Sequence, residues 1–231
     1  MEGYCLGKFK TDSYVFKDLP DMVREAQISG CEAELMEGVV NQRLDTVLYS
    51  KETHEHIARV ACCAAQIAGA MGLSAREVEL IRKAAAFHDV GKHEVPDYIL
   101  NKPGPLSPEE RKIMEAHSAR GWSYLVVSVS PIYKAGAVIA RQHHERWDGT
   151  GYPDGLKGCQ IHLYGRIVAV ADVYDALTSE RVYKKPWPMI EVIHHFTEMS
   201  GVLYDPEVIR PFLLLYGQRQ NTAQNQMNSP G

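Results

Sequence analysis

The feature that most restricts how this chain can fold is the spacing of its apolar residues, which recur at steps of three and four. Between residues 52 and 72 one such stripe contains Ile57, Val60, Ala61, Ala64, Ile67, Ala68 and Met71. This period places apolar side chains on one face of an α-helix, whereas a half-buried strand would alternate apolar and polar residues. No convincing alternating run occurs in the sequence. We therefore expect an all-α fold.

Capping and turn residues divide the chain into a series of helices. Ser74 and Glu77 have the spacing of a capping box, and Ser107-Pro108-Glu109-Glu110 combines an N-cap, a first-turn proline and an N3 glutamate. The segment 145–162 is rich in glycine and proline and is expected to be a loop. The predicted helices cover residues 52–72, 74–89, 107–126, 131–144, 163–179, 188–199 and 205–216.

The two ends of the chain differ from this central part. Residues 1–50 contain two helix-like stretches, 18–30 and 32–49, which are too short for a folded sensory domain. We therefore treat residues 1–50 as an N-terminal helical extension and residues 51–216 as the main domain. From Gly217 the sequence is polar, and we expect residues 217–231 to form a disordered tail.

Composition excludes several classes of protein. A net charge of -4 argues against a protein that binds nucleic-acid polymers, which usually carries a basic stripe. No apolar stretch approaches the roughly 20 residues that span a bilayer, and the N-terminus has no signal-peptide pattern. The five cysteines form no Cys-x-x-Cys pair, and we read them as reduced thiols. These features predict a cytoplasmic protein with no membrane segment.

Histidines and carboxylates near the predicted helix ends suggest a metal site. Glu52 and His56 lie four residues apart, so their side chains face the same way on a helix. Asp172 lies within an apolar helix, where a carboxylate is costly to bury unless it is paired or bound to a cation. The candidate ligands are Glu52, His56, His88, Asp89, His117, His143, His144 and Asp172.

A single histidine in a helix is more often an ordinary surface or core residue than a metal ligand. For this reason we assign no metal role to His54, His93, His162, His194 and His195. The metal hypothesis depends on the whole set of eight candidates. Imidazole with carboxylate suits iron, manganese, zinc or nickel. Two such ions, roughly 3.5–4 Å apart, can clamp a phosphate group and activate a water molecule.

At these positions the sequence resembles a known family. His88-Asp89 with Gly91-Lys92 resembles the signature of the HD phosphohydrolase superfamily. His143-His144-Glu145, followed by the segment from Asp148 to Pro153, resembles the extended signature of the HD-GYP subfamily. The resemblance continues through Arg166 and the segment 172–184, and it covers roughly residues 50–187 in the family's order and spacing.

The resemblance implies a helical bundle of the HD type, with residues 51–216 as the HD-GYP catalytic domain. It implies hydrolysis of cyclic di-GMP to linear pGpG, with GMP as the product of a second round. His56, His88, Asp89 and Asp172 would hold a first metal, and Asp89 would bridge to a second held by His117, His143 and His144. Glu52 matches a position that supports a third metal in some members, so two or three iron or manganese ions are expected.

The resemblance also assigns roles toward the substrate. Asp89 and Lys92 would act at the scissile phosphate, and Lys92, Asp175, Arg181 and Lys184 would contact the ligand. The loop from Gly149 to Pro153 has two roles open to it: a structural turn, or by family resemblance a functional loop that lines the substrate site or docks partner proteins such as GGDEF-domain cyclases. A homodimer is left open.

Two other functions remain open at this point. The chain could hydrolyse a different cyclic dinucleotide or a linear one, because pocket shape decides that preference. It could also be a cyclic-dinucleotide-binding or scaffolding module with weak turnover. The complete ligand set, with Lys92 beside it, favours an enzyme.

Overall fold

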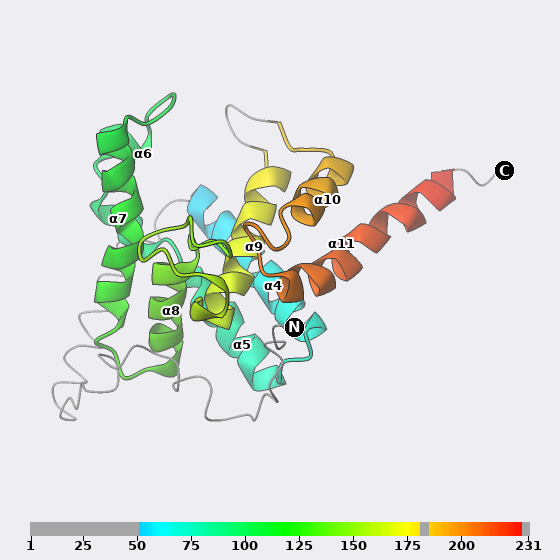
Figure 1. Ribbon diagram of the computed structural model, residues 1–231, viewed down its shortest axis with the longest axis horizontal. Helices are drawn as coiled ribbons and strands as arrows, with labels where there is room; N and C mark the ends of the chain where they lie inside the picture. The colour runs from blue at the N-terminus through cyan, green and yellow to red at the C-terminus, as the bar shows by residue number, and fades with distance from the viewer. Residues whose placement is uncertain (1–50, 181–184, 228–231) are drawn as a thin grey trace.

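The structure of this protein is a computed structural model that describes residues 51–180 and 185–227, with side chains described for 54–180 and 185–217. Within these ranges the chain is helical and contains no strand, as the apolar spacing predicts. Ser200 and Tyr204 form an isolated β-bridge. Figure 1 shows the helices gathered into one bundle, from which the last helix runs outward to the C-terminus.

Seven longer helices make up most of the described chain. They are α4 (Lys51–Ala70), α5 (Ala75–Ala84), α7 (Pro108–Leu125), α8 (Pro131–Gln142), α9 (Leu163–Thr178), α10 (Met189–Glu198) and α11 (Pro206–Met227). Four short elements connect them: the 3₁₀ turns η1 (Ala85–Phe87), η2 (Val90–Glu94) and η3 (Gly158–Gln160), and the helix α6 (Asp97–Leu100). The predicted capping boxes are present at Ser74 and Ser107.

One predicted helix ends earlier than expected. We expect a helix over residues 74–89, but α5 ends at Ala84 and the chain continues as η1 and η2. The physical reason is a close approach to α7, because a Cβ added to Gly91 would lie 2.1 Å from the main-chain oxygen of His117. His88 and Asp89 therefore lie at the junction of two 3₁₀ turns.

The last helix continues beyond its predicted end. We expect it to stop near Tyr216, whereas α11 runs to Met227, so the predicted tail begins as helix. The segment 217–227 contains Gln, Arg, Ala and Met, which are strong helix formers, and has no proline. Polarity alone is therefore a poor guide to where this helix ends.

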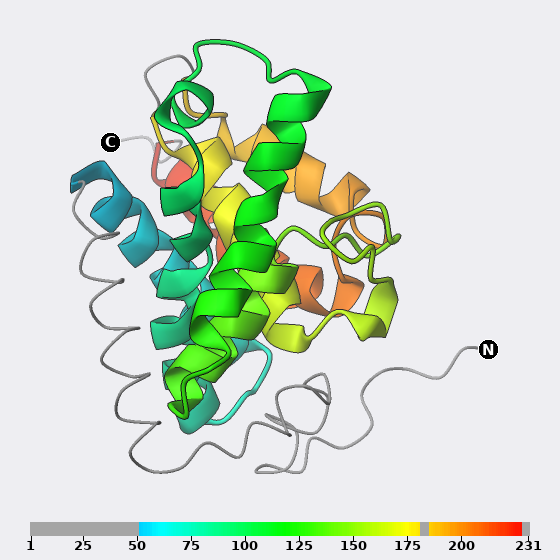
Figure 2. The same ribbon diagram turned by 90° about the vertical axis from the view of Figure 1, so that its left-hand side faces the viewer.

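The main hydrophobic core lies between α4, α9 and the two C-terminal helices. Ile67, Ile167, Phe196 and Phe212 are fully buried in it. Helix α4 packs on α5 and α9, while α8 packs on α7, α5 and α9. A second cluster around Leu125 joins η2, α7 and α8. Figure 2 shows α7 crossing the bundle on the side away from α11. The elements that carry the candidate ligands belong to both clusters: α4 and α9 to the main core, α7 and η2 to the second.

Several predicted features lie outside the described residues. These are the two helices within residues 1–50, the side chain of Glu52, and the residues Arg181 and Lys184. Among the described helices, none is long and apolar enough to cross a membrane. Cys62 and Cys63 are free thiols, as expected. Cys159 is disulfide-bonded, so the prediction of a reduced thiol is wrong there.

Candidate metal centre

Seven of the candidate ligands converge in the structure. They form two groups: His56, His88 and Asp172 in one, and Asp89, His117, His143 and His144 in the other. Within each group, one potential ligand atom from each residue lies within 4.8 Å of the others. Helices α4, α7 and α9, the residues that follow α8 and the η1–η2 junction supply them, over 117 positions of sequence from residue 56 to residue 172. The described part of the chain can therefore hold metal ions at two adjacent places.

Asp89 lies between the two groups. Its Oδ2 is 3.3 Å from Nε2 of His88 in the first group. Its Oδ1 is 3.4 Å from Nε2 of His117 and 3.7 Å from Nε2 of His143 in the second group. Each oxygen thus faces a different group, which is the arrangement that a carboxylate bridging two cations requires.

Four of the imidazoles direct Nε2 toward the centre because their Nδ1 atoms contact carbonyl or carboxylate oxygens on the opposite side of the ring. The Nδ1 of His88 is 2.9 Å from the carbonyl of Ala85. The Nδ1 of His117 is 2.7 Å from the carbonyl of Met114, and that of His143 is 3.0 Å from the carbonyl of Ile139. His56 is held at Nδ1 by the carboxylate of Asp175, 2.7 Å away. Such contacts fix the ring orientation and tautomer of a metal-binding histidine.

Two buried polar atoms of the centre have no hydrogen-bond partner. They are Oδ1 of Asp89 and Nε2 of His143, which face each other across 3.7 Å. A buried polar atom without a partner is costly, so such atoms need an explanation. A cation between the carboxylate oxygen and the imidazole lone pair would satisfy both. This observation, with the nitrogen and oxygen donor set, fits a first-row transition metal.

The electrostatics of the metal-free centre favour the charge states that ligands require. Burial and the neighbouring charge of His143 lower the pKa of His117 to about 4, and they also lower the pKa of His144. Both rings are therefore neutral near pH 7 and offer lone pairs. Burial opposes a low pKa for Asp89, but the charges of Lys92 and His88 hold it well below its usual value.

His88 differs from those two rings. Burial would lower its pKa, but the charge and hydrogen bond of Asp89 outweigh that effect and raise the pKa to about 9. The charge of Asp89 thus favours the protonated form of His88. A cation that binds there must displace that proton, as is usual when metals bind protein ligands.

Lys92 lies beside the bridging carboxylate. Its ammonium donates a 2.6 Å hydrogen bond to Oδ2 of Asp89. The spacing of three residues on η2 puts both side chains on the same side of this turn. The structure thus brings Lys92 to the centre, where the sequence places it.

Asp175 reaches the centre through His56. Its side chain is only 5% exposed, and it accepts hydrogen bonds from Arg59 and Ser179 as well as contacting His56. Burial raises the pKa of a carboxyl, but the hydrogen bonds from His56 and Arg59 hold that of Asp175 well below its usual range. Sequence reasoning did not single out Arg59, which lies one turn after His56 on α4.

The loop after His144 is ordered by side chains within it. Glu145 is buried and accepts hydrogen bonds from the main-chain N–H groups of Asp154 and Leu156, at 2.7 and 2.9 Å. These contacts support the structural role of the loop. Tyr152 also packs on His144, with ring centroids 4.7 Å apart, so the loop covers one side of the second ligand group. The sequence gives no signal for that packing beyond the position of the tyrosine.

Three of the histidines to which we assign no metal role, His93, His162 and His195, make ordinary hydrogen-bond contacts. His162 accepts a hydrogen bond from the N–H of Tyr164 and caps α9. His195 contacts the hydroxyl of Tyr204, and Nδ1 of His93 lies 2.8 Å from the carbonyl of Val90. None of these is in either ligand group found within the described residues.

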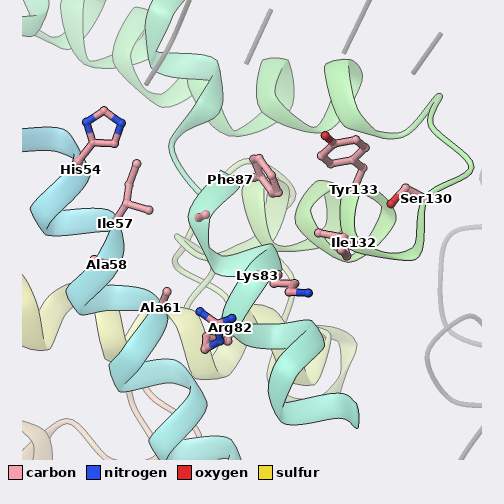
Figure 3. A pocket seen from close by; sticks show the side chains of 11 residues that line it. His54, Ile57, Ala58, Ala61, Arg82, Lys83, Phe87, Ser130, Ile132 and Tyr133 are labelled. Atoms are coloured by element: carbon pink, nitrogen blue, oxygen red, sulfur yellow. The ribbon is translucent and has the colours of Figure 1, made fainter. Parts of the chain in front are cut away.

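A separate pocket of about 500 Å³ lies between α4, the end of α5 and the start of α8. Figure 3 shows Ile57, Ala61 and Phe87 on its walls. Its two cationic side chains, Arg82 and Lys83, are engaged by the Glu79 carboxylate. No residue that lines it belongs to the two ligand groups found in the described part of the chain. The histidine–aspartate cluster is therefore the stronger candidate for chemistry.

Comparison with known proteins agrees with this geometry. A family profile described as HD domain matches residues 39–208. A cyclic di-GMP phosphodiesterase of Thermotoga maritima is 51% identical over 71% of this chain and 45% of the relative. The cyclic di-GMP phosphodiesterase response regulator RpfG of Xanthomonas campestris is 44% identical over 70% of this chain and 43% of the relative. The chain thus spans less than half the length of these relatives.

Other similar proteins extend the comparison. A 3'3'-cGAMP-specific phosphodiesterase 2 of Vibrio cholerae is 40% identical over 71% of this chain and 31% of the relative. The fold is similar to a solved V. cholerae cyclic GMP-AMP phosphodiesterase, with a TM-score of 0.54 and 21% identity over 86% of this chain and 54% of that one. It is also similar to the L. monocytogenes phosphodiesterase PgpH HD domain, with a TM-score of 0.53 and 19% identity over 79% of this chain and 98% of that one. With two adjacent ligand groups at the family's signature residues and a profile match over most of its length, this chain belongs to the HD domain family.

Proposed function

We propose that this chain is a metal-dependent phosphodiesterase that hydrolyses cyclic di-GMP to linear pGpG, with GMP as the product of a second round. The observation that carries the proposal is the position of Asp89, whose Oδ2 faces His88 of the first group while its Oδ1 faces His117 of the second. This Oδ1 is buried and has no hydrogen-bond partner. Two adjacent cations are a common means of cleaving phosphodiesters. The names of the relatives from T. maritima and X. campestris support the substrate.

The proposed ligands follow the two groups. His56, His88 and Asp172 would hold one ion, His117, His143 and His144 a second, and Asp89 would bridge them. Glu52 would support a third ion. We propose iron or manganese, which accept mixed imidazole and carboxylate ligands. When bound, these ions polarise phosphoryl oxygens and lower the pKa of a bound water molecule.

The remaining residues act on the substrate's negative charge. Cyclic di-GMP carries two phosphodiester charges, and the Lys92 ammonium, already beside Asp89, can donate to a phosphate oxygen. Arg181 and Lys184 would bind the second phosphate, since a guanidinium forms a two-pronged contact and an ammonium acts as a point charge. We do not include Asp175 in this set, because protein groups already engage both of its carboxylate oxygens.

Turnover by the metal-loaded protein tests the proposal. Protein purified anaerobically with iron or manganese should convert cyclic di-GMP to pGpG, measured by chromatography of the products. Asp89→Ala should abolish both metal binding and turnover. His194→Gln is a suitable control, because His194 is exposed and contacts only Glu198 among the ion pairs of the described residues. Tight binding of cyclic di-GMP by the metal-loaded protein with no product would instead indicate a binding or scaffolding module.

The number of metals has its own test. Glu52→Ala should lower the metal content by about one ion per chain if Glu52 is a ligand, and leave it unchanged if Glu52 only supports another ligand. Elemental analysis of the two purified proteins measures the difference.

A second substrate deserves a parallel assay, because one relative that is 40% identical is named as specific for 3'3'-cGAMP. Equal concentrations of cyclic di-GMP and 3'3'-cGAMP should be supplied as competitors. A higher kcat/KM for cyclic di-GMP would support the proposed substrate, and a higher value for 3'3'-cGAMP would replace it.

Two partners are proposed: a GGDEF-domain protein and a second copy of this chain. Docking of GGDEF-domain proteins would use the exposed part of the Gly149–Pro153 loop, where Thr150 and Pro153 reach solvent. A pull-down with wild-type protein and with Thr150→Lys would test this contact, and size-exclusion chromatography with light scattering would test for a homodimer.

A further inference from the structure

The way in which His56 is held differs from that of His88, His117 and His143, the three other imidazoles of the centre whose Nδ1 contacts are described. The Nδ1 atoms of His88, His117 and His143 contact carbonyls three or four residues earlier in the chain, which local helical structure provides. Nδ1 of His56 contacts a carboxylate 119 residues away, on α9. A long-range partner of this kind exists only when α4 and α9 are packed together, and it carries a full negative charge.

Asp175 is built into this contact from several sides. Oδ2 accepts from His56 at 2.7 Å and from Nη2 of Arg59 at 3.2 Å. Oδ1 accepts from Nε of Arg59 at 2.5 Å and from the Ser179 hydroxyl at 3.1 Å. The guanidinium thus donates hydrogen bonds to the carboxylate from two nitrogens, and this bidentate geometry fixes the plane of the carboxylate. With a carboxylate so fully engaged, the His56 ring has one favoured orientation.

Helix α9 contacts the His56 ring at both nitrogens. Asp175 holds Nδ1, and Oδ1 of Asp172 lies 3.5 Å from Nε2. Asp172 and Asp175 are three residues apart and therefore share one face of the helix. One face of α9 thus supplies both a proposed metal ligand and the group that orients its neighbour.

We propose that Asp175 and Arg59 are positioning residues for the first metal: Asp175 fixes His56 with its proton on Nδ1, and Arg59 fixes Asp175. The inference rests on the proposed function, since it assigns His56 as a ligand. It replaces the role of substrate contact that the family resemblance implies for Asp175. A carboxylate that is 5% exposed and engaged at both oxygens has no acceptor atom left for a guanine base, and its charge would repel a phosphate.

Arg59 supplies a surface-accessible way to test this arrangement. Its side chain is 47% exposed, so a substitution there leaves the hydrophobic core intact. Among the described residues, its other ionic partner is Glu55, 3.9 Å away and 63% exposed. Glu55→Gln therefore removes a charge next to Arg59 without touching Asp175 or His56, and it serves as a matched control.

The experiment measures Mn²⁺ binding and catalysis in the same proteins. Wild type, Arg59→Gln, Arg59→Lys, Asp175→Asn, the double variant Arg59→Gln/Asp175→Asn and the control Glu55→Gln are titrated with Mn²⁺, and free Mn²⁺ is followed by electron paramagnetic resonance. The kcat and KM for cyclic di-GMP are then measured at saturating Mn²⁺. Circular dichroism melting confirms that each variant is folded.

The expected result is selective for one ion. Asp175→Asn should lower the affinity for one of the bound ions by roughly 10- to 100-fold, the usual effect of removing a group that orients a metal-binding histidine. Arg59→Gln should have a smaller effect in the same direction, Arg59→Lys an intermediate one, and Glu55→Gln none. Because Arg59 acts through Asp175, the double variant should bind Mn²⁺ no more weakly than Asp175→Asn alone. The KM at saturating Mn²⁺ should stay within about twofold of wild type.

Other outcomes separate the two claims. If Asp175→Asn raises KM and leaves Mn²⁺ affinity unchanged, Asp175 contacts the substrate and the inference is overturned while the proposed function stands. If the effects of Arg59→Gln and Asp175→Asn simply add, Arg59 does not act through Asp175. If wild-type protein binds no Mn²⁺ and no iron, the proposed function fails and the inference fails with it.

Discussion

At the residue scale, the centre depends on how closely the η1–η2 junction approaches α7. Gly91 lies against the main chain of this helix, so that a Cβ would be 2.1 Å from the carbonyl oxygen of His117 and 2.6 Å from the N–H nitrogen of Gly121. Main-chain atoms in a packed helix cannot move aside as a flexible side chain can. The glycine therefore allows Asp89 to reach the His117 group.

A pair of glycine substitutions tests this dependence. Gly91→Ala should destabilise the protein by about 3 kcal/mol, at the upper end of the usual cost of overpacking, and should lower the metal content. Gly69→Ala is the matched control, since no atom lies within 4 Å of an added Cβ near the exposed end of α4, and it should stabilise by about 0.5 kcal/mol. Urea unfolding measures both. Equal free energies of unfolding for the two variants would contradict the close approach of Gly91 to the main chain of α7.

Much of the residue-level account could be predicted from the sequence. The seven imidazole and carboxylate groups that converge were all recognisable, because their residue types and their order along the chain resemble a known signature. Arg59 and the packing of Tyr152 on His144 could not be predicted, because each depends on contacts between segments far apart in the sequence or on the path of a loop. The roles of Glu52, Arg181 and Lys184 stay predictions.

At the scale of elements, caps fix where the helices begin. Ser74 and Ser107 cap α5 and α7 as their sequence patterns predict. Helix α9 begins differently, with Nδ1 of His162 accepting the N–H of Tyr164 at 3.1 Å. Its start was predictable within a residue, but the capping group was not, because histidine is not among the usual N-cap residues. The end of α5 at Ala84 was missed, because the packing that ends it is not local.

The His162 cap makes stability depend on pH. Burial and the charge of Arg166 lower the pKa of His162 to about 4 in the folded state, below the ordinary value of 6.5. The stabilisation is therefore complete above pH 6.5 and is lost as the pH falls toward 4, because the unfolded chain binds the proton more tightly. Protonation also removes the acceptor that caps α9.

An asparagine variant isolates this effect. His162→Asn offers a capping oxygen at every pH, so it should be close to wild type at pH 7. Between pH 7 and pH 5 wild type should lose about 1–2 kcal/mol more stability than the variant, measured by urea unfolding at each pH. Parallel stability curves for the two proteins would show that His162 does not titrate in this range.

At the scale of the whole molecule, the centre ties together parts of the chain that are far apart in sequence. His56 and Asp172 lie on α4 and α9, which form the main core, whereas Asp89 lies at the η1–η2 junction and His117 on α7, beside the second cluster. The all-α class and most helix positions were predictable, because apolar periodicity and caps are local signals. The way in which the helices cross to form two ligand groups is a matter of packing.

Removal of metal should therefore weaken the whole molecule. At a free ion concentration of 100 times the Kd, binding of one ion stabilises the folded state by about 2.7 kcal/mol. In a domain of this size this corresponds to a Tm shift of roughly 5–10 °C. Dialysis against a chelator should lower the Tm by this amount, and added Mn²⁺ should restore it. Asp89→Ala should show no such response to chelator. An unchanged wild-type Tm would indicate that the ligand groups bind no ion tightly.

The most direct measurement of the central claim is chromatography of the products formed from cyclic di-GMP by the manganese- or iron-loaded chain. The shared carboxylate of Asp89 and the adjacent Lys92 predict linear pGpG, formed by wild type and lost in Asp89→Ala. Intact cyclic di-GMP after prolonged incubation with folded protein whose metal content has been verified would contradict the account.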